Sequence, residues 1–461
     1  NNWSPSSLAL SSEQLERPIE MRDPPIGVMK LRRSGCLILI SRVSFVVISL
    51  TSIWLILLQF SNFSVTRFSP RFNRGKPDGS NIDESLNEMP LENLTSCQCR
   101  ATDGTIVEMC YSLPENPEIK GMKFSCEHLK YLEGLDLLHH HDTLIEDDTL
   151  EYTVIVTAAS ADFFKHVSRL VSRSRKVHPD IRVYVYNLGM TPSQISELYE
   201  VCNLEISEID FLAYEPHLRN LHEFRWKPLV IADALRQFDS FWYWDSSVVP
   251  TIGHFDRVAD LIRCRDRNKL YNGPVPSIEI RDRREDLGNI PSGFDEDVHE
   301  KNVKECKKYP YLLHSFTGHG IFAATHKDMY KYLPTNDTEI RKSKAKMFEA
   351  GLAYIVRRDE VLKDVIKWYV LCALEKDCMA PRNSMPTCFF EGHTQYEEWA
   401  GCHRFDQSAL NILLANVNHY DRHYYTSDIV DFFKIEREYD EDEDIDMPAL
   451  GCNKPMLVNN I

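Results

Sequence analysis

The sequence predicts an α/β fold with a largely parallel sheet flanked by helices. Short apolar, β-branched segments at 153–159, 181–186 and 240–244 are typical of buried strands. Stretches with apolar residues at helical spacing lie between or beside them, at 162–177, 192–201 and 227–238. Because strands and helices alternate at this spacing, the strands are expected to run parallel and to be joined by crossover helices.

An apolar segment near the N-terminus predicts a membrane anchor. Residues 36–60 are interrupted only by Arg42, and 43–60 carry no charge, which approaches the length of about 20 residues that a spanning helix needs. Lys30, Arg32 and Arg33 precede the segment, so the N-terminus is expected in the cytosol. A cleaved signal peptide is the alternative interpretation.

Composition shifts suggest six regions along the chain. We expect a cytoplasmic tail at 1–35, a transmembrane signal anchor at 36–60 and a polar stem at 61–96. A disulfide-tied lead-in at 97–150 precedes the main domain at 151–435, and an acidic, solvated tail follows at 436–461.

Cysteines and charge restrict the compartment and the partners. Outside the apolar segment there are twelve cysteines, an even number, as expected for an oxidising compartment. Eight of them form two clusters, one of Cys97, Cys99, Cys110 and Cys126 and one of Cys372, Cys378, Cys388 and Cys402. Zinc is the alternative for these clusters, although no paired CxxC motif occurs. A net charge of −16 argues against nucleic acid as a partner. The Asn-x-Ser/Thr triplets that begin at Asn62, Asn93 and Asn336, after the apolar segment, agree with a single-pass type II membrane glycoprotein of the Golgi or endoplasmic reticulum, with its large domain lumenal.

The chemistry is expected at Asp245, which follows the predicted strand 240–244, because ligands of parallel sheets bind at the carboxyl ends of strands. The sequence Trp-Asp-Ser-Ser at 244–247, after a helix and a strand, resembles the Asp-x-Asp turn of glycosyltransferases with the A fold. Two later segments, 317–322 and 406–411, resemble in order the corresponding segments of glycogenin-like, retaining members.

A second resemblance covers the chain from about Tyr152 onward. The segments 225–229, 244–247 and 402–407 are similar to those of an uncharacterised, membrane-anchored domain family expanded in nematodes. That resemblance implies no activity.

The glycosyltransferase resemblance implies transfer of a sugar from a nucleotide-diphosphate donor to a glycan, protein or lipid acceptor, with Mn²⁺ or Mg²⁺ against the diphosphate. It implies catalytic roles for Asp245, Asp406 and Gln407. The expected substrate-binding residues are Arg225, Lys227, Ser247, His319 and Gly320. The expected metal ligands are Asp245, His319 and His403.

One departure from the pattern leaves alternatives open. Ser247 stands where the second carboxylate is expected, and a hydroxyl is a weaker, neutral ligand. A metal could be held by Asp245 and a histidine, or bases such as Lys227, Arg225 or Arg404 could replace it. Otherwise the domain is a catalytically inactive lumenal binding or adhesion domain that retains the fold.

Each candidate also has a structural interpretation. Asp245 could cap a turn and Asp406 could cap the helix predicted at 407–415. His319 could be a hydrogen-bonded structural histidine, and Arg225 and Lys227 could be surface residues or members of ion pairs.

Overall fold

The computed structural model divides the chain into two compact units, Asn1–Ser64 and Val65–Ile461. It describes residues 94–138, 153–251, 256–264, 295–306, 308–390 and 395–437, with the backbone of 66–68 and residues 445, 447, 450 and 451. The expected cytoplasmic tail and membrane anchor lie outside the described residues. No helix in the described ranges has the length and apolar character that crossing a membrane requires.

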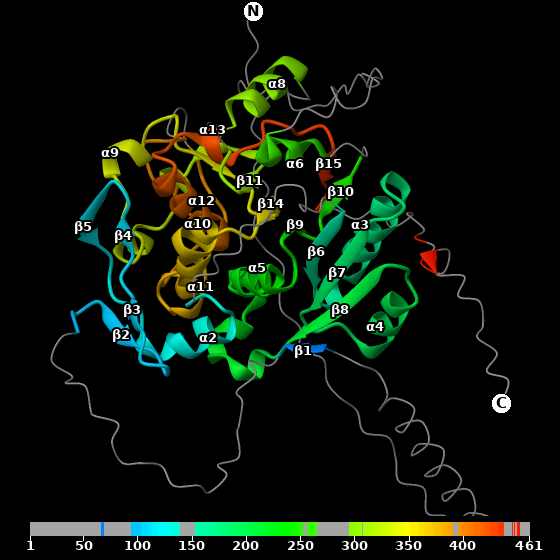
Figure 1. Ribbon diagram of the computed structural model, residues 1–461, viewed down its shortest axis with the longest axis horizontal. Helices are drawn as coiled ribbons and strands as arrows, with labels where there is room; N and C mark the ends of the chain where they lie inside the picture. The colour runs from blue at the N-terminus through cyan, green and yellow to red at the C-terminus, as the bar shows by residue number, and fades with distance from the viewer. Residues whose placement is uncertain are drawn as a thin grey trace, which may run out of the picture. The chain divides into compact units, whose positions relative to one another are not determined.

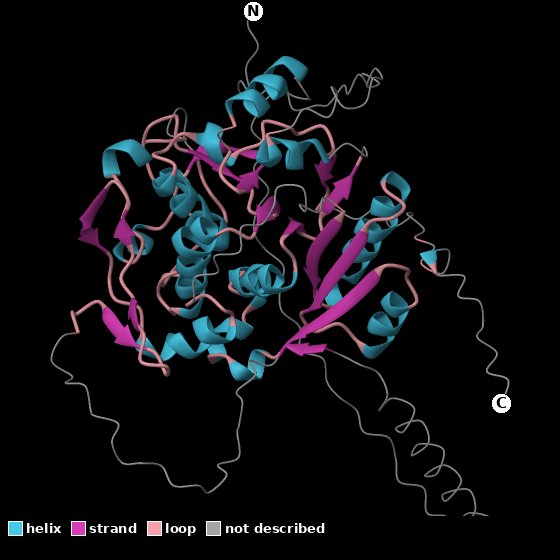
Figure 2. Ribbon diagram, in the orientation of Figure 1, coloured by secondary structure: helices cyan, strands magenta, loops and turns pink. Residues whose placement is uncertain are grey.

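The second unit is built on one mixed sheet of seven strands (Figures 1 and 2). Its order is β1 (Thr66–Phe68), β8 (Leu204–Ile209), β7 (Arg182–Asn187), β6 (Val154–Ala159), β9 (Ser240–Trp244), β14 (Leu352–Val356) and β11 (Tyr311–Leu313). The pairs from β1 to β9 are parallel, whereas β14 is antiparallel to both of its neighbours. The predicted α/β class and largely parallel sheet are confirmed.

Helices cover both faces of the sheet (Figure 1). The core on one face includes side chains of α3 (Phe164–Val177), α4 (Pro192–Tyr199) and α6 (Asp256–Arg263). The core on the other face includes α5 (Trp226–Gln237), α11 (Lys367–Leu374) and α12 (Phe405–Val417). Successive β6 residues alternate between the two cores, as side chains of a doubly covered strand must.

The remaining elements are short. Two ribbons, β10 (Val248–Pro250) with β15 (Phe433–Ile435) and β12 (Phe316–Gly320) with β13 (Lys346–Phe348), lie outside the main sheet. The other helices with described bounds are α2 (Leu129–Gly134), α8 (Glu296–Glu305), α9 (Asp337–Ile340), α10 (Asp359–Val361) and α13 (Arg422–Tyr425). The chain is helical from α10 through a π-helical turn at Leu362–Ile366 to the end of α11.

The predicted lead-in belongs to the same compact unit as the main domain. It contains two hairpins, β2 (Gln98–Arg100) with β3 (Ile106–Glu108) and β4 (Ser112–Leu113) with β5 (Asn116–Lys120). Tyr111 packs edge-on against Trp368 of α11, with ring centroids 5.4 Å apart. The backbone N–H of Met122 donates to the Lys331 carbonyl at 2.7 Å. These contacts join the lead-in to the apolar core instead of leaving it as a separate module.

Disulfides are present as expected for the cysteine clusters. The described bonds are Cys97–Cys110, Cys99–Cys126, Cys264–Cys306, Cys372–Cys378 and Cys388–Cys402. The cysteines of both clusters are therefore paired with one another, and the zinc alternative is wrong for them.

The stem and the tail differ from expectation where they are described. The backbone of Thr66–Phe68, within the expected stem, forms strand β1 beside β8. At the other end, the Glu436 N–H donates to the Ser247 carbonyl at 2.9 Å. Gly451 forms an antiparallel bridge with Val201. The solvated tail was therefore predicted to begin too early, because Glu436 still belongs to the folded domain.

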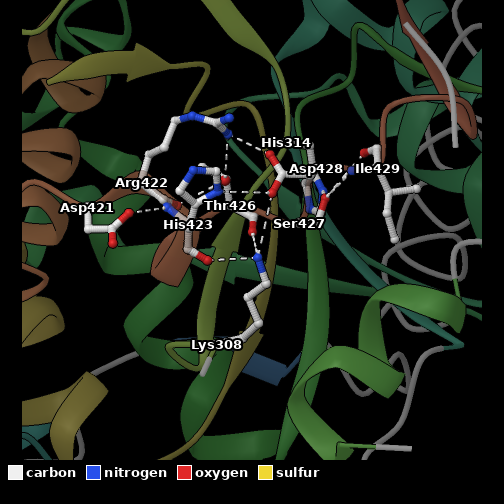
Figure 3. Close-up of polar contacts among 9 residues, drawn as sticks. All are labelled: Lys308, His314, Asp421, Arg422, His423, Thr426, Ser427, Asp428 and Ile429. Carbon is white, nitrogen blue, oxygen red and sulfur yellow. Dashed lines mark hydrogen bonds and ion pairs between the residues drawn. The ribbon is translucent and has the colours of Figure 1, made fainter. Parts of the chain in front are cut away.

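An ion network fixes the segment after α13 (Figure 3). Lys308 donates from Nζ to the carbonyls of His423 and Thr426, at 2.7 and 2.8 Å. Asp428 lies between Lys308 Nζ, 3.7 Å from its Oδ2, and an Arg422 guanidinium nitrogen, 2.5 Å from its Oδ1. Burial raises the pKa of the Asp428 carboxyl, but these two cations outweigh burial and lower it. The network links the chain before β11 to the chain after α13.

Replacing Asp428 with asparagine is expected to reduce the free energy of unfolding by about 3 kcal/mol at pH 7, because the buried Lys308 ammonium loses its carboxylate. A carboxyl with a lowered pKa stabilises the fold above its unfolded pKa of about 3.9 and ceases to do so as pH falls through its folded pKa. Denaturant unfolding at pH 7 and pH 3 should therefore show a smaller difference at pH 3. Glu305→Gln, which breaks an exposed pair with Lys301, should change stability by less than about 1 kcal/mol.

Candidate functional site

The topology of the sheet puts Asp245 at a switch point of the strand order. From β6 the chain proceeds outward through β7 and β8, then returns to add β9 on the other side of β6. The strand order therefore reverses between β6 and β9 (Figure 1). In open α/β sheets ligands bind outside the carboxyl ends of the strands at such a switch point. Asp245 is the first residue after β9.

Three elements bring an ammonium and two carboxylates together there. Lys227, in the first turn of α5, lies with its Nζ 2.9 Å from Asp245 Oδ2 and 2.9 Å from Asp406 Oδ2. Asp406 belongs to the first turn of α12. The side chains of Lys227 and Asp406 are 5% and 6% exposed, whereas that of Asp245 is 28% exposed. The Lys227 ammonium and the Asp406 carboxyl are therefore buried, and Asp245 is the solvent-accessible carboxylate of the cluster.

The pKa values of Lys227 and Asp406 are shifted for different reasons. Burial lowers the pKa of the Lys227 ammonium, but Asp245 and Asp406 outweigh burial and raise it above its ordinary value. Burial raises the pKa of the Asp406 carboxyl to about 6, even against the attraction of Lys227. Lys227 is thus always charged near neutral pH, whereas Asp406 changes its charge in the range where acid–base groups are useful.

Two further residues hold Asp245 in place. The Tyr243 hydroxyl donates to Asp245 Oδ1 at 2.9 Å, and the Asp245 N–H donates to the Gly351 carbonyl at 2.7 Å. A Cβ atom at position 351 would lie 2.5 Å from Asp245 Oδ2. Only glycine therefore permits this approach. Neither residue was predicted, since Tyr243 sits in an apolar strand and the contact of Gly351 depends on the pairing of β14 with β9.

Replacing Gly351 with alanine is expected to displace the Asp245 carboxylate and to weaken ligand binding at the site at least about tenfold, the loss that one charge-assisted hydrogen bond represents. The accompanying loss of stability should be about 1–3 kcal/mol, typical of overpacking. Nucleotide binding and thermal unfolding of the variant test both effects. Unchanged binding would show that Asp245 does not need its present position.

Backbone strain accompanies the cluster. Phe224 and Phe405 have positive φ angles of 54° and 42°, a conformation that bulky side chains rarely adopt. Phe224 lies two residues before α5, which carries Lys227, and Phe405 is the first residue of α12, which carries Asp406. Their ring centroids lie 6.3 Å apart. The Lys227 ammonium lies 5.0 Å from the Phe224 ring centroid. Such strain concentrates at binding and catalytic sites.

Arg225 does not belong to this cluster. Its guanidinium donates to the Glu223 carboxylate and to the main-chain carbonyls of Ala373, Glu375 and Lys376, at 2.6–2.9 Å. It is 1% exposed and holds the C-terminal end of α11. The expectation that Arg225 contacts a substrate phosphate is therefore wrong, because its donors are engaged within the protein.

The predicted metal set does not assemble. His403 is fully buried, its Nδ1 accepts the His326 N–H at 3.1 Å, and its Nε2 lies 2.9 Å from the Met379 carbonyl. His319 has Nδ1 3.1 Å from the Gly320 carbonyl and its ring stacked on Phe390. Burial lowers the pKa of both histidines to about 4.

Among the described residues, the one group of three His, Cys, Asp or Glu side chains with converging donor atoms is Cys97, Glu108 and Cys110. Two of these form a disulfide. The expectation that Asp245, His319 and His403 share a divalent ion is wrong, since their donor atoms do not converge.

Of the other predicted residues, Ser247 and Gln407 lie close in sequence to the acidic residues of the cluster, whereas Gly320 packs against protein. Gly320 is covered by Tyr396, whose Cδ1 would lie 2.7 Å from a Cβ at that position, so the close approach is to protein and not to a ligand. Ser247 follows Asp245 in the turn to β10, and its carbonyl accepts the Glu436 N–H. Gln407 lies beside Asp406, and within the described ranges no protein group pairs with its side-chain amide.

His314 and Ser427 have the residue types of a base and a nucleophile, but their contacts are structural. His314 Nδ1 lies 2.6 Å from Ser427 Oγ (Figure 3), and both residues are buried. The Ser427 hydroxyl donates to the Ile429 carbonyl at 3.2 Å, so its proton is directed away from the imidazole. Burial also lowers the pKa of His314 to about 3. This pair is no site for acyl transfer.

Comparison with known proteins gives a family match for part of the chain. Residues 97–232 match the family described as "Protein of unknown function (DUF1647)". The match starts before the position from which the second resemblance was expected and ends before Asp245. No curated protein matches the sequence.

Solved structures similar to this chain are glycosyltransferases. Galactosyltransferase LgtC, in complex with donor and acceptor sugar analogs, is 14% identical over 59% of this chain and 72% of its own, with a TM-score of 0.27. GlyE of Streptococcus pneumoniae TIGR4 is 10% identical over 60% of this chain, with a TM-score of 0.28. The bifunctional enzyme WbbM is 10% identical over 59% of this chain, with a TM-score of 0.29. This chain spans 45% of GlyE and 38% of WbbM.

Proposed function

We propose that this chain is a glycosyltransferase that moves a sugar from a nucleotide-diphosphate donor to a glycan, protein or lipid acceptor. The observation that carries the proposal is the Asp245–Lys227–Asp406 cluster at the switch point of the sheet. In open α/β sheets, nucleotides bind at such a switch point. Carboxylates and amides bind sugar hydroxyls by accepting and donating hydrogen bonds, so Asp245, Asp406 and Gln407 are assigned to the sugar.

The roles follow from exposure and charge. Asp245, partly exposed and held by Tyr243, is positioned to accept a hydrogen bond from a donor hydroxyl. Lys227 fixes the relative placement of Asp245 and Asp406 and keeps both oriented. Positioning of this kind lowers the entropic part of a transfer barrier.

The proposed location is the lumen of the Golgi or endoplasmic reticulum, with a type II anchor at 36–60. The five described disulfides support an oxidising compartment. The anchor itself rests on the apolar sequence.

A catalytically inactive lumenal binding domain is the second candidate. It is favoured by Ser247 in place of a carboxylate and by histidines whose donor atoms do not converge with Asp245. Such a domain would bind a nucleotide or glycan without turnover.

A donor screen separates the two. The whole chain and its Asp245→Asn variant are incubated with a panel of UDP- and GDP-sugars, and released nucleotide is measured. Glycosyltransfer predicts donor hydrolysis that falls at least about a hundredfold in Asp245→Asn, the effect of losing a major transition-state contact. Asp337→Asn, at a side chain 77% exposed, is the matched control and should retain activity. Nucleotide binding without any turnover would favour the binding domain.

A further inference from the structure

Both oxygens of the Asp245 carboxylate already make a contact within the protein. Oδ1 accepts the Tyr243 hydroxyl and Oδ2 contacts the Lys227 ammonium, both at 2.9 Å. A hard divalent cation binds to carboxylate oxygens at about 2.0–2.6 Å. An ion on Asp245 would therefore lie close to a buried ammonium of the same sign. Ser247 offers a neutral hydroxyl where a second carboxylate would otherwise offset that repulsion.

Arg404 is a basic residue close to Asp406 in sequence that forms no ion pair with the described residues. It lies two residues before Asp406, and its main-chain N–H donates to the Ala324 carbonyl at 3.1 Å. No carboxylate in the described ranges pairs with its guanidinium, and its Nε is buried without a hydrogen-bond partner. Burial is the main cause of the lowered pKa of His319, and the positive charge of Arg404 lowers that pKa further. A guanidinium is permanently charged and presents several donors in a geometry that matches phosphate.

Lys227 explains why Arg404 remains available. Asp406 is the carboxylate nearest in sequence to Arg404, yet it lies 2.9 Å from Lys227 Nζ. The ammonium therefore engages both acidic side chains and leaves the guanidinium for an anion. The first turn of α12, a helix of 13 residues, begins beside Arg404, and the amino end of a helix favours negative charge.

We propose that this site binds the donor diphosphate without a divalent cation and that Arg404 is the group that faces the phosphates. This inference rests on the proposed function. Lys227 keeps the acidic side chains from competing for Arg404 and does not itself replace the metal. The ligand class is a nucleoside diphosphate, recognised through its charged oxygens.

The experiment measures the affinity of the whole chain for UDP and GDP by calorimetry, in EDTA and in MnCl₂ or MgCl₂. The dissociation constants should agree within about threefold, a difference smaller than one typical hydrogen bond. Arg404→Met should weaken binding in EDTA by roughly tenfold or more, and Arg404→Lys should restore part of the loss. Arg382→Met, at a side chain 84% exposed, is the control and should bind as the parent chain does. Thermal unfolding checks that each variant is folded.

The outcomes distinguish this inference from the proposed function. Binding in MnCl₂ that is lost in EDTA overturns metal independence and leaves the proposed function standing. Equal affinities in EDTA and MnCl₂, with Arg404→Met unaffected and folded, overturn the role of Arg404. Failure of both nucleotides to bind under either condition overturns the proposed function and this inference with it.

Discussion

Replacing Lys227 with methionine is expected to lower the free energy of unfolding by about 3–5 kcal/mol at pH 8 and by much less at pH 5. Methionine preserves most of the side-chain volume but leaves Asp406, which is 6% exposed, without its counter-charge. Removing one partner of a buried ion pair typically costs this amount. Lys227 has a raised pKa, so its stabilising charge is fully present below its unfolded pKa of about 10.4 and is lost only as pH rises through the folded pKa.

The difference between the two pH values comes from Asp406. Its carboxyl already has a pKa of about 6 beside Lys227, and loss of the ammonium raises that pKa further. At pH 5 the carboxyl is neutral and needs no partner. Denaturant unfolding of the variant and the parent chain at both pH values measures the effect, and the double variant Lys227→Met, Asp406→Asn should recover more than half of the loss at pH 8.

Lys301→Met, at an exposed side chain in α8, is the matched control and should change stability by less than about 0.5 kcal/mol. An equal loss at pH 5 and pH 8 in Lys227→Met would assign the cost to packing instead of charge. Donor hydrolysis should also fall in this variant, because Asp245 and Asp406 lose their common anchor.

Much of the fold could be predicted from local sequence. The segments 153–159, 181–186 and 240–244 correspond to β6, β7 and β9, because strands buried on both faces read as continuous apolar runs. The helix expected at 227–238 is α5, with Pro228 in its first turn. The strands β14 and β11 were not predicted, since their antiparallel addition depends on pairing between distant segments.

Only part of the site could be predicted from the sequence. Asp245 and Asp406 could be proposed from their neighbours in sequence, but the bridge through Lys227 depends on how α5 and α12 pack. His319 and His403 have the residue type of metal ligands, and only burial reveals that their rings are structural. Arg225 was predicted to contact a phosphate because its carbonyl partners lie about 150 residues away in sequence and could not be identified without the fold.

Replacing Asp406 with asparagine is expected to raise the free energy of unfolding at pH 7.5 by about 2–3 kcal/mol. The folded pKa of this carboxyl, about 6, lies above its ordinary value of 3.8 because burial disfavours the charged form, and each pKa unit corresponds to about 1.4 kcal/mol. A raised carboxyl pKa means that the native state binds the proton more tightly. The stabilising contribution is therefore present below about pH 4 and is lost as pH rises through 6.

Asparagine mimics the neutral carboxyl at every pH, so the gain in stability should vanish near pH 4 and reach its full value above pH 7. Urea unfolding across pH 4–8 measures this gain, and lower stability at pH 7.5 would contradict it. Donor hydrolysis should meanwhile fall in the variant by at least about a hundredfold if Asp406 orients the sugar. A variant that is more stable and less active would show that the ionised Asp406 lowers stability where it serves the ligand, the trade-off expected of a functional group in a buried site.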